Sequence, residues 1–161
     1  MEQRLWHTLS QTNEWIRYSD GKAVAMLGIQ GVLIGLVVAF VKDFSTGLKV
    51  ASTVLFIVGT VCIVAAMVFT FMCLTPRLKN GGKATPIFFG SVAANFKTPK
   101  DYSQYLGENF STEEKISESL AEQIHANSKI ASTKFRWVSW STRLTLLGLA
   151  LWAAFLFLNL F

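Results

Sequence analysis

Three long stretches of this 161-residue sequence contain no Asp, Glu, Lys or Arg. They cover residues 23–41, 50–76 and 144–161, and they are 19, 27 and 18 residues long. A helix needs about 20 consecutive apolar residues to cross the hydrocarbon core of a bilayer. Only 16% of the residues are charged and 52% are hydrophobic, which disfavours a soluble globular protein. The sequence therefore predicts three transmembrane helices.

Residues that commonly carry catalytic or metal chemistry are also scarce. The two histidines, His7 and His125, stand apart from any cluster with metal-ligand spacing. The two cysteines, Cys62 and Cys73, both fall in the second apolar stretch, where we expect them to be small apolar side chains. The sequence has no Gly-rich phosphate loop and no nucleophile motif. We therefore expect no enzyme activity, no catalytic residue, no metal site and no cofactor.

The placement of Lys and Arg predicts the orientation of these helices. Nine of the 15 Lys and Arg residues lie in segment 77–141, whereas the short connection at 42–49 holds two. Cytoplasmic loops of membrane proteins carry the excess of Lys and Arg. We therefore expect the N-terminus and the middle segment to face the cytoplasm, with the C-terminus outside. No small-residue cleavage site follows the first stretch, so we interpret it as a permanent anchor.

The expected fold is an all-α membrane protein with a small helical cytoplasmic domain between its second and third spans. Proline at Pro76 predicts the end of the second span, and Thr98-Pro99 predicts a helix start. Ser111 and Glu114 have capping-box spacing, and no Gly or Pro follows them until Gly148. The third span is therefore expected to continue a cytoplasmic stalk helix. The predicted segments are an amphipathic cytoplasmic helix at 1–22, transmembrane helices at 23–41 and 50–75, a basic helical domain at 76–141 and a transmembrane helix at 142–161.

Two glycines in the first span, Gly31 and Gly35, form a small-xxx-small pattern that permits close helix approach. Two interpretations of this pattern stay open. The glycines could pack against another helix of the same subunit, or they could pack between subunits of an oligomer.

Several polar residues are candidates for binding a ligand. Asp20 and Lys22 lie at the mouth of the first span, where charges usually have partners or a purpose. Gln123, Asn127 and Lys134 recur at helical spacing along the stalk, either on its packed seam or on its solvated side. The basic excess of the middle segment favours an anionic partner, such as lipid headgroups or a phosphate-bearing small molecule.

The segment Trp-Ile-Arg-Tyr-Ser-Asp-Gly-Lys-Ala at 15–23 resembles the Tyr-Ala-Asp-x-Lys-Ala motif before the first span of the Pycsar transmembrane effector family. Ser19 and Gly21 stand where that family has Ala and commonly Thr. The resemblance extends over residues 12–145. It is carried by further short motifs that occur in the family's order: Pro76-Arg77, Phe88-Phe89-Gly90, Tyr102, Gln123-Ile124 and Lys134-Phe135.

This resemblance implies a membrane effector of bacterial anti-phage defence. A partner cyclase would make a cyclic pyrimidine mononucleotide, cCMP or cUMP, which the effector would bind at its cytoplasmic side. The effector, expected to be a homo-oligomer that binds no nucleic acid polymer, would then impair the inner membrane and cause abortive infection. The resemblance suggests residues for the nucleotide site around Asp20: Lys22, Arg77 and Lys134 for phosphate, Phe89 or Tyr102 for stacking, and Gln123 or Asn127 for the base edge.

Two other functions remain possible from the residues alone. The first is a membrane scaffold or adaptor whose basic domain binds lipid headgroups or a protein partner. The second is a transporter, which is disfavoured because the three spans carry no charged residue and only two amides, Gln30 and Asn159.

The first testable prediction concerns orientation. A reporter fused after Phe161 should be periplasmic, because the Lys and Arg excess retains segment 77–141 in the cytoplasm. Paired phosphatase and fluorescent-protein fusions would measure this. A cytoplasmic reporter at the C-terminus would contradict the third span.

Overall fold

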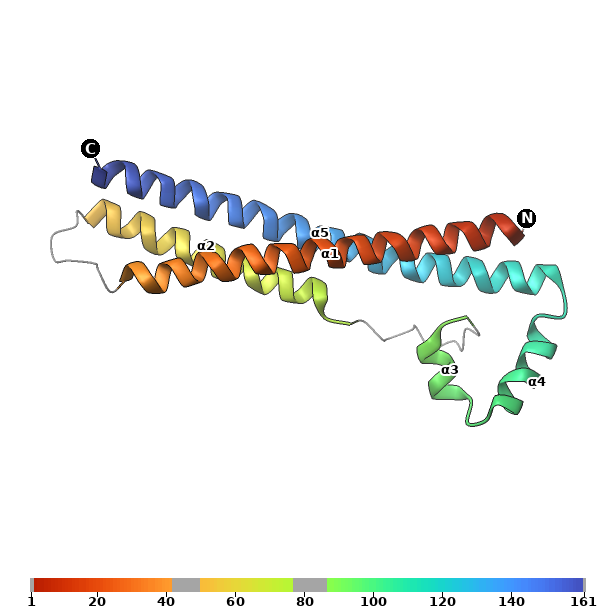
Figure 1. The fold of residues 1–161 in the computed structure, drawn as a ribbon. Coiled ribbons are helices and arrows are strands. Elements are labelled where there is room, and N and C mark those ends of the chain that lie inside the picture. The colour runs from red at the N-terminus through yellow and green to blue at the C-terminus, as the bar shows by residue number, and fades with distance from the viewer. Residues whose placement is uncertain (1, 42–49, 77–86, 161) are drawn as a thin grey trace. The chain divides into compact units, whose positions relative to one another are not determined.

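The computed structural model describes residues 2–41, 50–76 and 87–160, and every regular element in these ranges is a helix (Figure 1). The three long helices are α1 (Glu2–Val41), α2 (Val50–Leu74) and α5 (Glu113–Leu160). Two short helices, α3 (Phe89–Asn95) and α4 (Pro99–Asn109), lie between α2 and α5 in the chain. Each long helix contains a stretch that is long and apolar enough to cross a membrane. The prediction of an all-helical fold with three candidate spans is confirmed.

The helix boundaries follow local sequence signals. Helix α2 ends at Leu74, two residues before Pro76. At the start of α4, the Thr98 hydroxyl accepts from the Asp101 amide, and the Asp101 carboxylate accepts from the Thr98 amide. Helix α5 begins differently from the expected Ser111–Glu114 box: the Thr112 hydroxyl accepts from the Lys115 amide, and the Ser111 hydroxyl donates to the Glu108 carbonyl.

Two of the long helices combine segments that the sequence analysis treated separately. Helix α5 has 48 residues, so the expected stalk and third span form one unbroken helix. Helix α1 has 40 residues and likewise joins the expected N-terminal helix to the first span. The short apolar segment 87–94 contributes most of α3.

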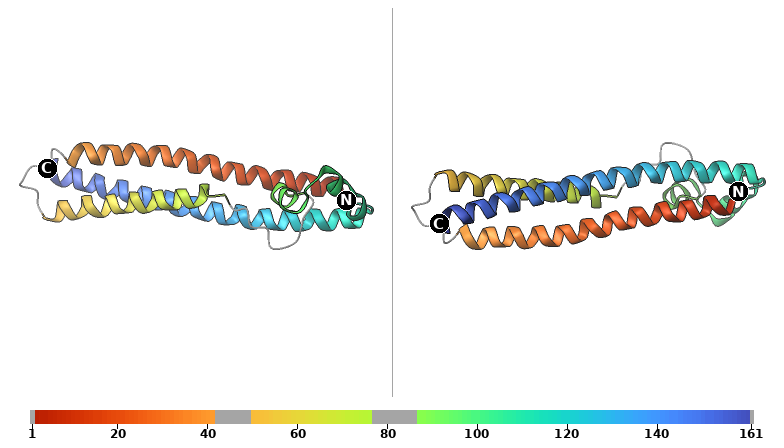
Figure 2. Two further views of the ribbon diagram at one scale, coloured as in Figure 1. Left: turned by 90° about the horizontal axis from the view of Figure 1, so that it is seen from below. Right: turned by 90° about the horizontal axis from the view of Figure 1, so that it is seen from above.

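The chain folds as two compact units, and α1 and α5 each contribute to both. Unit 1 consists of Met1–Tyr18 and Pro76–Ser132, and it contains α3 and α4. Unit 2 consists of Ser19–Thr75 and Thr133–Phe161. In unit 2 the segments of α1, α2 and α5 lie side by side, as the two views of Figure 2 show.

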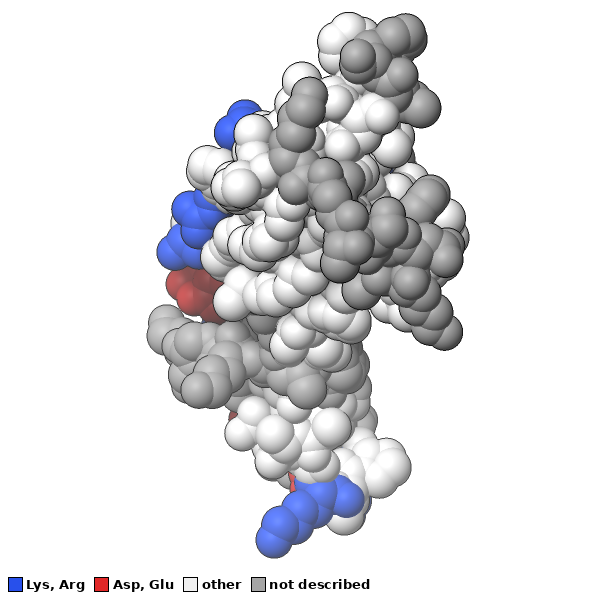
Figure 3. All heavy atoms as spheres, turned by 90° about the vertical axis from the view of Figure 1, so that its left-hand side faces the viewer, with Lys and Arg blue, Asp and Glu red and all other residues white. Residues whose placement is uncertain are grey.

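The buried residues of unit 2 recur at intervals of three, four or seven positions, so each helix presents one stripe to the other two. These stripes are rich in small and polar side chains, whereas many large apolar side chains point outward. Outward apolar side chains are what a lipid environment accepts. Figure 3 views the face where α2 begins and α5 ends, and most of its described atoms are uncharged. The buried positions are Ser19, Ala23, Gln30, Ser52, Gly59, Ile63, Ala66, Thr70, Cys73, Lys134, Val138, Ser141, Thr145 and Gly148.

The closest approach of two helices in unit 2 occurs where Gly59 of α2 meets Gly148 of α5. A Cβ atom at Gly148 would lie 2.9 Å from the Gly59 carbonyl oxygen and 2.7 Å from Ile63 Cγ1. A Cβ atom at Gly59 would lie 2.5 Å from Trp152 Cδ1. A side chain at Gly148 would therefore press on the α2 backbone, and a side chain at Gly59 would displace the Trp152 ring.

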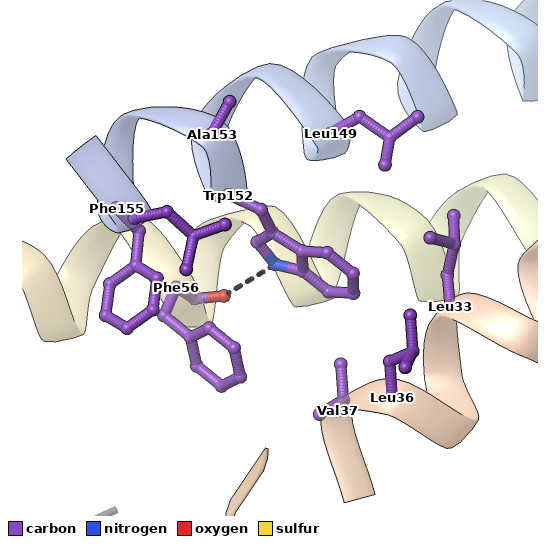
Figure 4. Close-up of a pocket in the computed structure, with 9 residues that line it drawn as sticks. Leu33, Leu36, Val37, Phe56, Leu149, Trp152, Ala153 and Phe155 are labelled. Carbon is purple, nitrogen blue, oxygen red and sulfur yellow. Dashed lines mark hydrogen bonds between the residues drawn. The ribbon is translucent and has the colours of Figure 1, made fainter. Parts of the chain in front are cut away.

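An apolar pocket of about 300 Å³ lies beside this crossing and is lined by all three long helices. Figure 4 shows the Trp152 ring between Leu33 and Leu36 of α1 and Phe56 of α2. The Trp152 indole N–H donates to the Phe56 carbonyl at 3.4 Å, and the Trp152 and Phe56 rings stack with centroids 6.0 Å apart. The pocket offers only apolar side chains, so it suits hydrocarbon rather than a charged ligand.

The structure does not support the within-subunit interpretation of Gly31 and Gly35. No described atom lies within 4 Å of a Cβ placed at either residue, or at Gly28 on the same helix. All three glycines are exposed on α1. Packing between subunits stays a prediction for these positions.

Substitution of the crossing glycines should separate them from the exposed ones. Gly148→Ala should destabilise the protein by about 1–3 kcal/mol, because overpacking forces the backbones apart. Gly21→Ala, on an exposed helix face, should be neutral or stabilise by up to about 1 kcal/mol through helix propensity. Thermal unfolding in detergent would measure both. Equal midpoints for the two variants would contradict the close crossing of α2 and α5.

Candidate functional site

A buried lysine of α5 connects all three long helices in unit 2. Lys134 is 5% exposed. Its ammonium donates to Asp20 Oδ1 of α1 at 2.5 Å and to the Cys73 carbonyl of α2 at 2.9 Å. Cys73 lies in the last turn of α2, where carbonyl groups have no partner within the helix and the helix end carries partial negative charge. We call this arrangement of Lys134, Asp20 and the Cys73 carbonyl the Lys134 clamp.

The electrostatics of the clamp are asymmetric. The side chain of Lys134 is 7% exposed, whereas that of Asp20 is 37% exposed. Water can therefore compensate the carboxylate if the pair separates, but the ammonium would lose its negative partner inside the helix bundle. Removing one partner of a buried ion pair typically costs about 3–5 kcal/mol, and the exposure of Asp20 places this pair at or below the lower limit.

A second polar layer lies around Gln30. The Gln30 Nε2 donates to the hydroxyls of Ser141 at 2.8 Å and Thr145 at 3.0 Å. The Gln30 Oε1 accepts from the Thr70 hydroxyl at 3.0 Å, and the Thr70 and Ser141 hydroxyls lie 2.7 Å apart. All four side chains are buried. Both amide protons of Gln30 are used, so this layer joins α1, α2 and α5 through satisfied hydrogen bonds.

Unit 1 contains a chain of three amides that joins the buried Gln123 and Asn127 of α5 to the exposed Asn13 of α1. Gln123 Nε2 donates to Asn127 Oδ1 at 2.8 Å, and Asn127 Nδ2 donates to Asn13 Oδ1 at 2.7 Å. Gln123 is 3% exposed and Asn127 is 8% exposed. The two residues therefore lie on the packed seam of α5 and not on its solvated side, which decides between the two interpretations of the stalk.

Unit 1 also contains a hollow with aromatic walls. Its volume is about 610 Å³, and it is bordered by α1, α3 and α4. Tyr102 lies on its wall and contacts Phe96, with ring centroids 5.2 Å apart. Tyr105 also contacts Phe96, at 4.9 Å. The lining residues are Trp6, Ile87, Val92, Ala93, Tyr102, Leu106 and Phe110.

The residues expected to bind nucleotide are distributed over both units. In unit 2, Lys134 pairs with Asp20, and Lys22 is exposed on α1. In unit 1, Gln123 pairs with Asn127, Tyr102 borders the hollow, and Phe89 is the first residue of α3. Arg77 lies outside the described residues.

Sequence reasoning missed the partners that complete these networks. Thr70 and Thr145 lie in apolar stretches, and Ser141 lies at the end of the segment assigned to the basic domain. Nothing in their local sequence indicates a polar layer. One signal was available: Gln30 is the only amide in the first span, and an amide in a span normally needs a partner on another helix.

Comparisons with known proteins give the chain's family. The family model described as the PycTM Pycsar effector protein domain matches residues 4–159. The chain belongs to the PycTM family of Pycsar effectors. It is also similar to "Pycsar effector protein PtPycTM" of Propioniciclava tarda, with 31% identity over 153 residues, or 91% of this chain and 74% of that protein. No solved structure matches the chain significantly.

The PycTM match confirms the family resemblance drawn from the short motifs. It covers nearly the whole chain and therefore both units. The protein is a Pycsar effector of anti-phage defence, and its three long helices are candidates to place it in a membrane.

The layer around Gln30 generates the third prediction. Gln30→Leu should lower the stability of this PycTM protein by about 1 kcal/mol, because three interhelical hydrogen bonds are lost. The cost stays modest because the Thr145 hydroxyl donates to a carbonyl one turn back on its own helix, and the Thr70 hydroxyl can donate to such a carbonyl in place of Gln30. The matched control is Asn159→Leu, since the Asn159 amide is exposed and donates within its own helix. Thermal unfolding in detergent should show a lower midpoint for Gln30→Leu alone. Equal midpoints would contradict the role of the layer.

Proposed function

We propose that this PycTM protein is a non-enzymatic effector that binds cCMP or cUMP in unit 1 and then impairs the inner membrane through unit 2. A partner cyclase supplies the nucleotide, and the loss of membrane integrity causes abortive infection. Membership of the Pycsar effector family carries this proposal. The division of the chain into a unit with an aromatic hollow and a unit with three apolar helices supports it.

The hollow of unit 1 is the best place for the nucleobase. Its volume of about 610 Å³ falls within the range of about 300–1,000 Å³ that is typical of small-molecule sites. Trp6, Tyr102 and Phe110 supply rings on which a base can stack. Stacking on aromatic side chains is common to all bases, so polar groups near the hollow would have to select a pyrimidine. Gln123 and Asn127 remain the proposed residues for the base edge.

The phosphate needs a cation, and Lys22, Arg77 and Lys134 are the expected candidates. Lys22 and Lys134 belong to unit 2, so for a nucleotide in unit 1 the proposed candidate is Arg77, which lies outside the described residues. Lys22 is exposed on α1. Lys134 already pairs with Asp20, so a phosphate could reach it only by displacing that carboxylate. Phe89, at the start of α3, stays a proposed second stacking residue beside Tyr102.

Helix α5 provides a route from the nucleotide to the membrane. It passes from unit 1 into unit 2, and its sequence has no glycine or proline between Glu113 and Gly148. A ligand acts only by favouring one arrangement over another, and a helix without a hinge transmits such a shift along its length. We propose an inner-membrane orientation with the N-terminus inside and the C-terminus outside, as the Lys and Arg placement predicts.

The exposed glycines of α1 support assembly into a homo-oligomer. Gly28, Gly31 and Gly35 are free of contacts with the described residues and would admit a helix from another subunit at close range. This assembly would place several copies of unit 2 together in one membrane.

The fourth prediction tests the nucleotide and its site together. The full chain, reconstituted in liposomes, should bind cCMP or cUMP saturably and then release a trapped dye, whereas cAMP and cGMP should not trigger release. Tyr102→Ala should weaken nucleotide binding about tenfold, since stacking on one aromatic ring contributes about 1–3 kcal/mol per base. The matched control is Tyr105→Ala, which removes the other tyrosine in contact with Phe96 but leaves the wall of the hollow in place.

Two outcomes would contradict this proposal. Equal effects of the two tyrosine variants would mean that the hollow is not the base site. The absence of binding by all four cyclic nucleotides would favour the scaffold alternative, in which lipid headgroups or a protein partner occupy unit 1.

A further inference from the structure

We propose that the Lys134 clamp is an inhibitory lock. It holds the three long helices of unit 2 in the resting arrangement, and its opening is the step that permits membrane damage. This inference rests on the proposed function, because it describes how the membrane activity is kept off before the nucleotide arrives.

The first argument is the position of the clamp. Among the residues that the structure describes, Lys134 is the only buried residue with a charged side chain. Its ammonium reaches α1 through Asp20 and the last turn of α2 through the Cys73 carbonyl. One group on α5 therefore constrains both other helices. A displacement of α5 must break these contacts or move all three helices together.

The second argument is the small size of the buried apolar side chains of unit 2. At the clamp these are Ala23, Cys73 and Val138, and only partly buried large side chains, Leu74 and Trp137, pack against them. The buried apolar side chains of unit 2 are small or of moderate size, and Ile63 is the largest. Between membrane helices such side chains gain little, because lipid tails solvate apolar surface as well as a neighbouring helix does. Polar contacts therefore decide which arrangement is favoured. The buried apolar residues are Ala23, Ile63, Ala66, Cys73 and Val138.

The third argument is the asymmetry of the pair. The Asp20 carboxylate is exposed enough to bind water in place of Lys134, whereas the Lys134 side chain is buried. Separation of the pair is therefore unfavourable mainly for Lys134. The pair holds in the absence of a ligand, but another partner can compete with Lys134 for the Asp20 carboxylate. A contact of this kind can hold one of two arrangements without preventing the other.

The lock and the phosphate-binding interpretation of Lys134 predict opposite results. If Lys134 is a lock, its neutralisation should release the membrane activity without nucleotide. If Lys134 only binds the phosphate, its neutralisation should cause no leakage without nucleotide and should abolish the response to nucleotide. If the clamp only stabilises the fold, its loss should lower the stability of the protein and cause no leakage.

The test measures dye release from liposomes that contain the full chain, with no nucleotide present. Lys134→Gln and Asp20→Asn should each increase the leakage rate about tenfold over the parent, as expected when one arrangement loses its main stabilising contact. The double variant should leak no faster than the faster single variant, because both singles break the same contact. Arg136→Gln is the matched control, since it removes one positive charge from an exposed position of α5 and should behave like the parent.

The remaining outcomes also decide the question. Tight liposomes with both Lys134→Gln and Asp20→Asn would overturn the lock. If Lys134→Gln fails to insert, Asp20→Asn decides alone, because it changes one atom of a partly exposed side chain. Leakage of Arg136→Gln at the same rate as the clamp variants would overturn the lock as well. A parent protein that responds to neither cCMP nor cUMP would reject the proposed ligand, while the leakage of the clamp variants would still decide the lock.

Discussion

A polar group buried between membrane helices needs a partner on another helix or on its own helix, and this constraint shapes the packed seam of unit 2. Lys134 and Ser141 of α5 find their partners on α1 and α2, whereas the buried Ser52 hydroxyl and Trp137 indole N–H have none among the described residues. Lys134 pairs with Asp20 and the Cys73 carbonyl, and Ser141 pairs with Gln30 and Thr70. The seam is therefore built from paired polar layers, with small residues between them that let the helices approach.

In this seam, the contacts that select one arrangement of the helices contribute more than the general attraction between the helices. Hydrogen bonds with fixed partners select one register among the three helices, because a shift along the axis would leave several groups unpaired. Small buried side chains add little further attraction in lipid. A bundle of this kind has one favoured arrangement without strong apolar attraction to hold it, as the proposed response to a nucleotide requires.

The two units divide the chemistry that the proposed function needs. Unit 1 offers an aromatic hollow and a chain of three hydrogen-bonded amides, and unit 2 offers apolar outer faces with a polar interior. Helices α1 and α5 belong to both units. Each of these helices is unbroken across the boundary between the two units. The proposed nucleotide binding in one unit and the proposed membrane activity in the other therefore involve the same two helices.

The sequence by itself determined the helices, their approximate ends and the family, because these depend on local signals. An apolar run of sufficient length, Pro76 after α2 and the Thr98 cap of α4 act over a few residues each. The tertiary structure alone decided which helix faces meet. Gln30 bonds to partners 40, 111 and 115 residues away, and the close crossing uses Gly59 and Gly148 and leaves Gly31 and Gly35 exposed. In lipid the apolar faces of a helix are nearly equivalent, so only contacts between distant residues select the buried face.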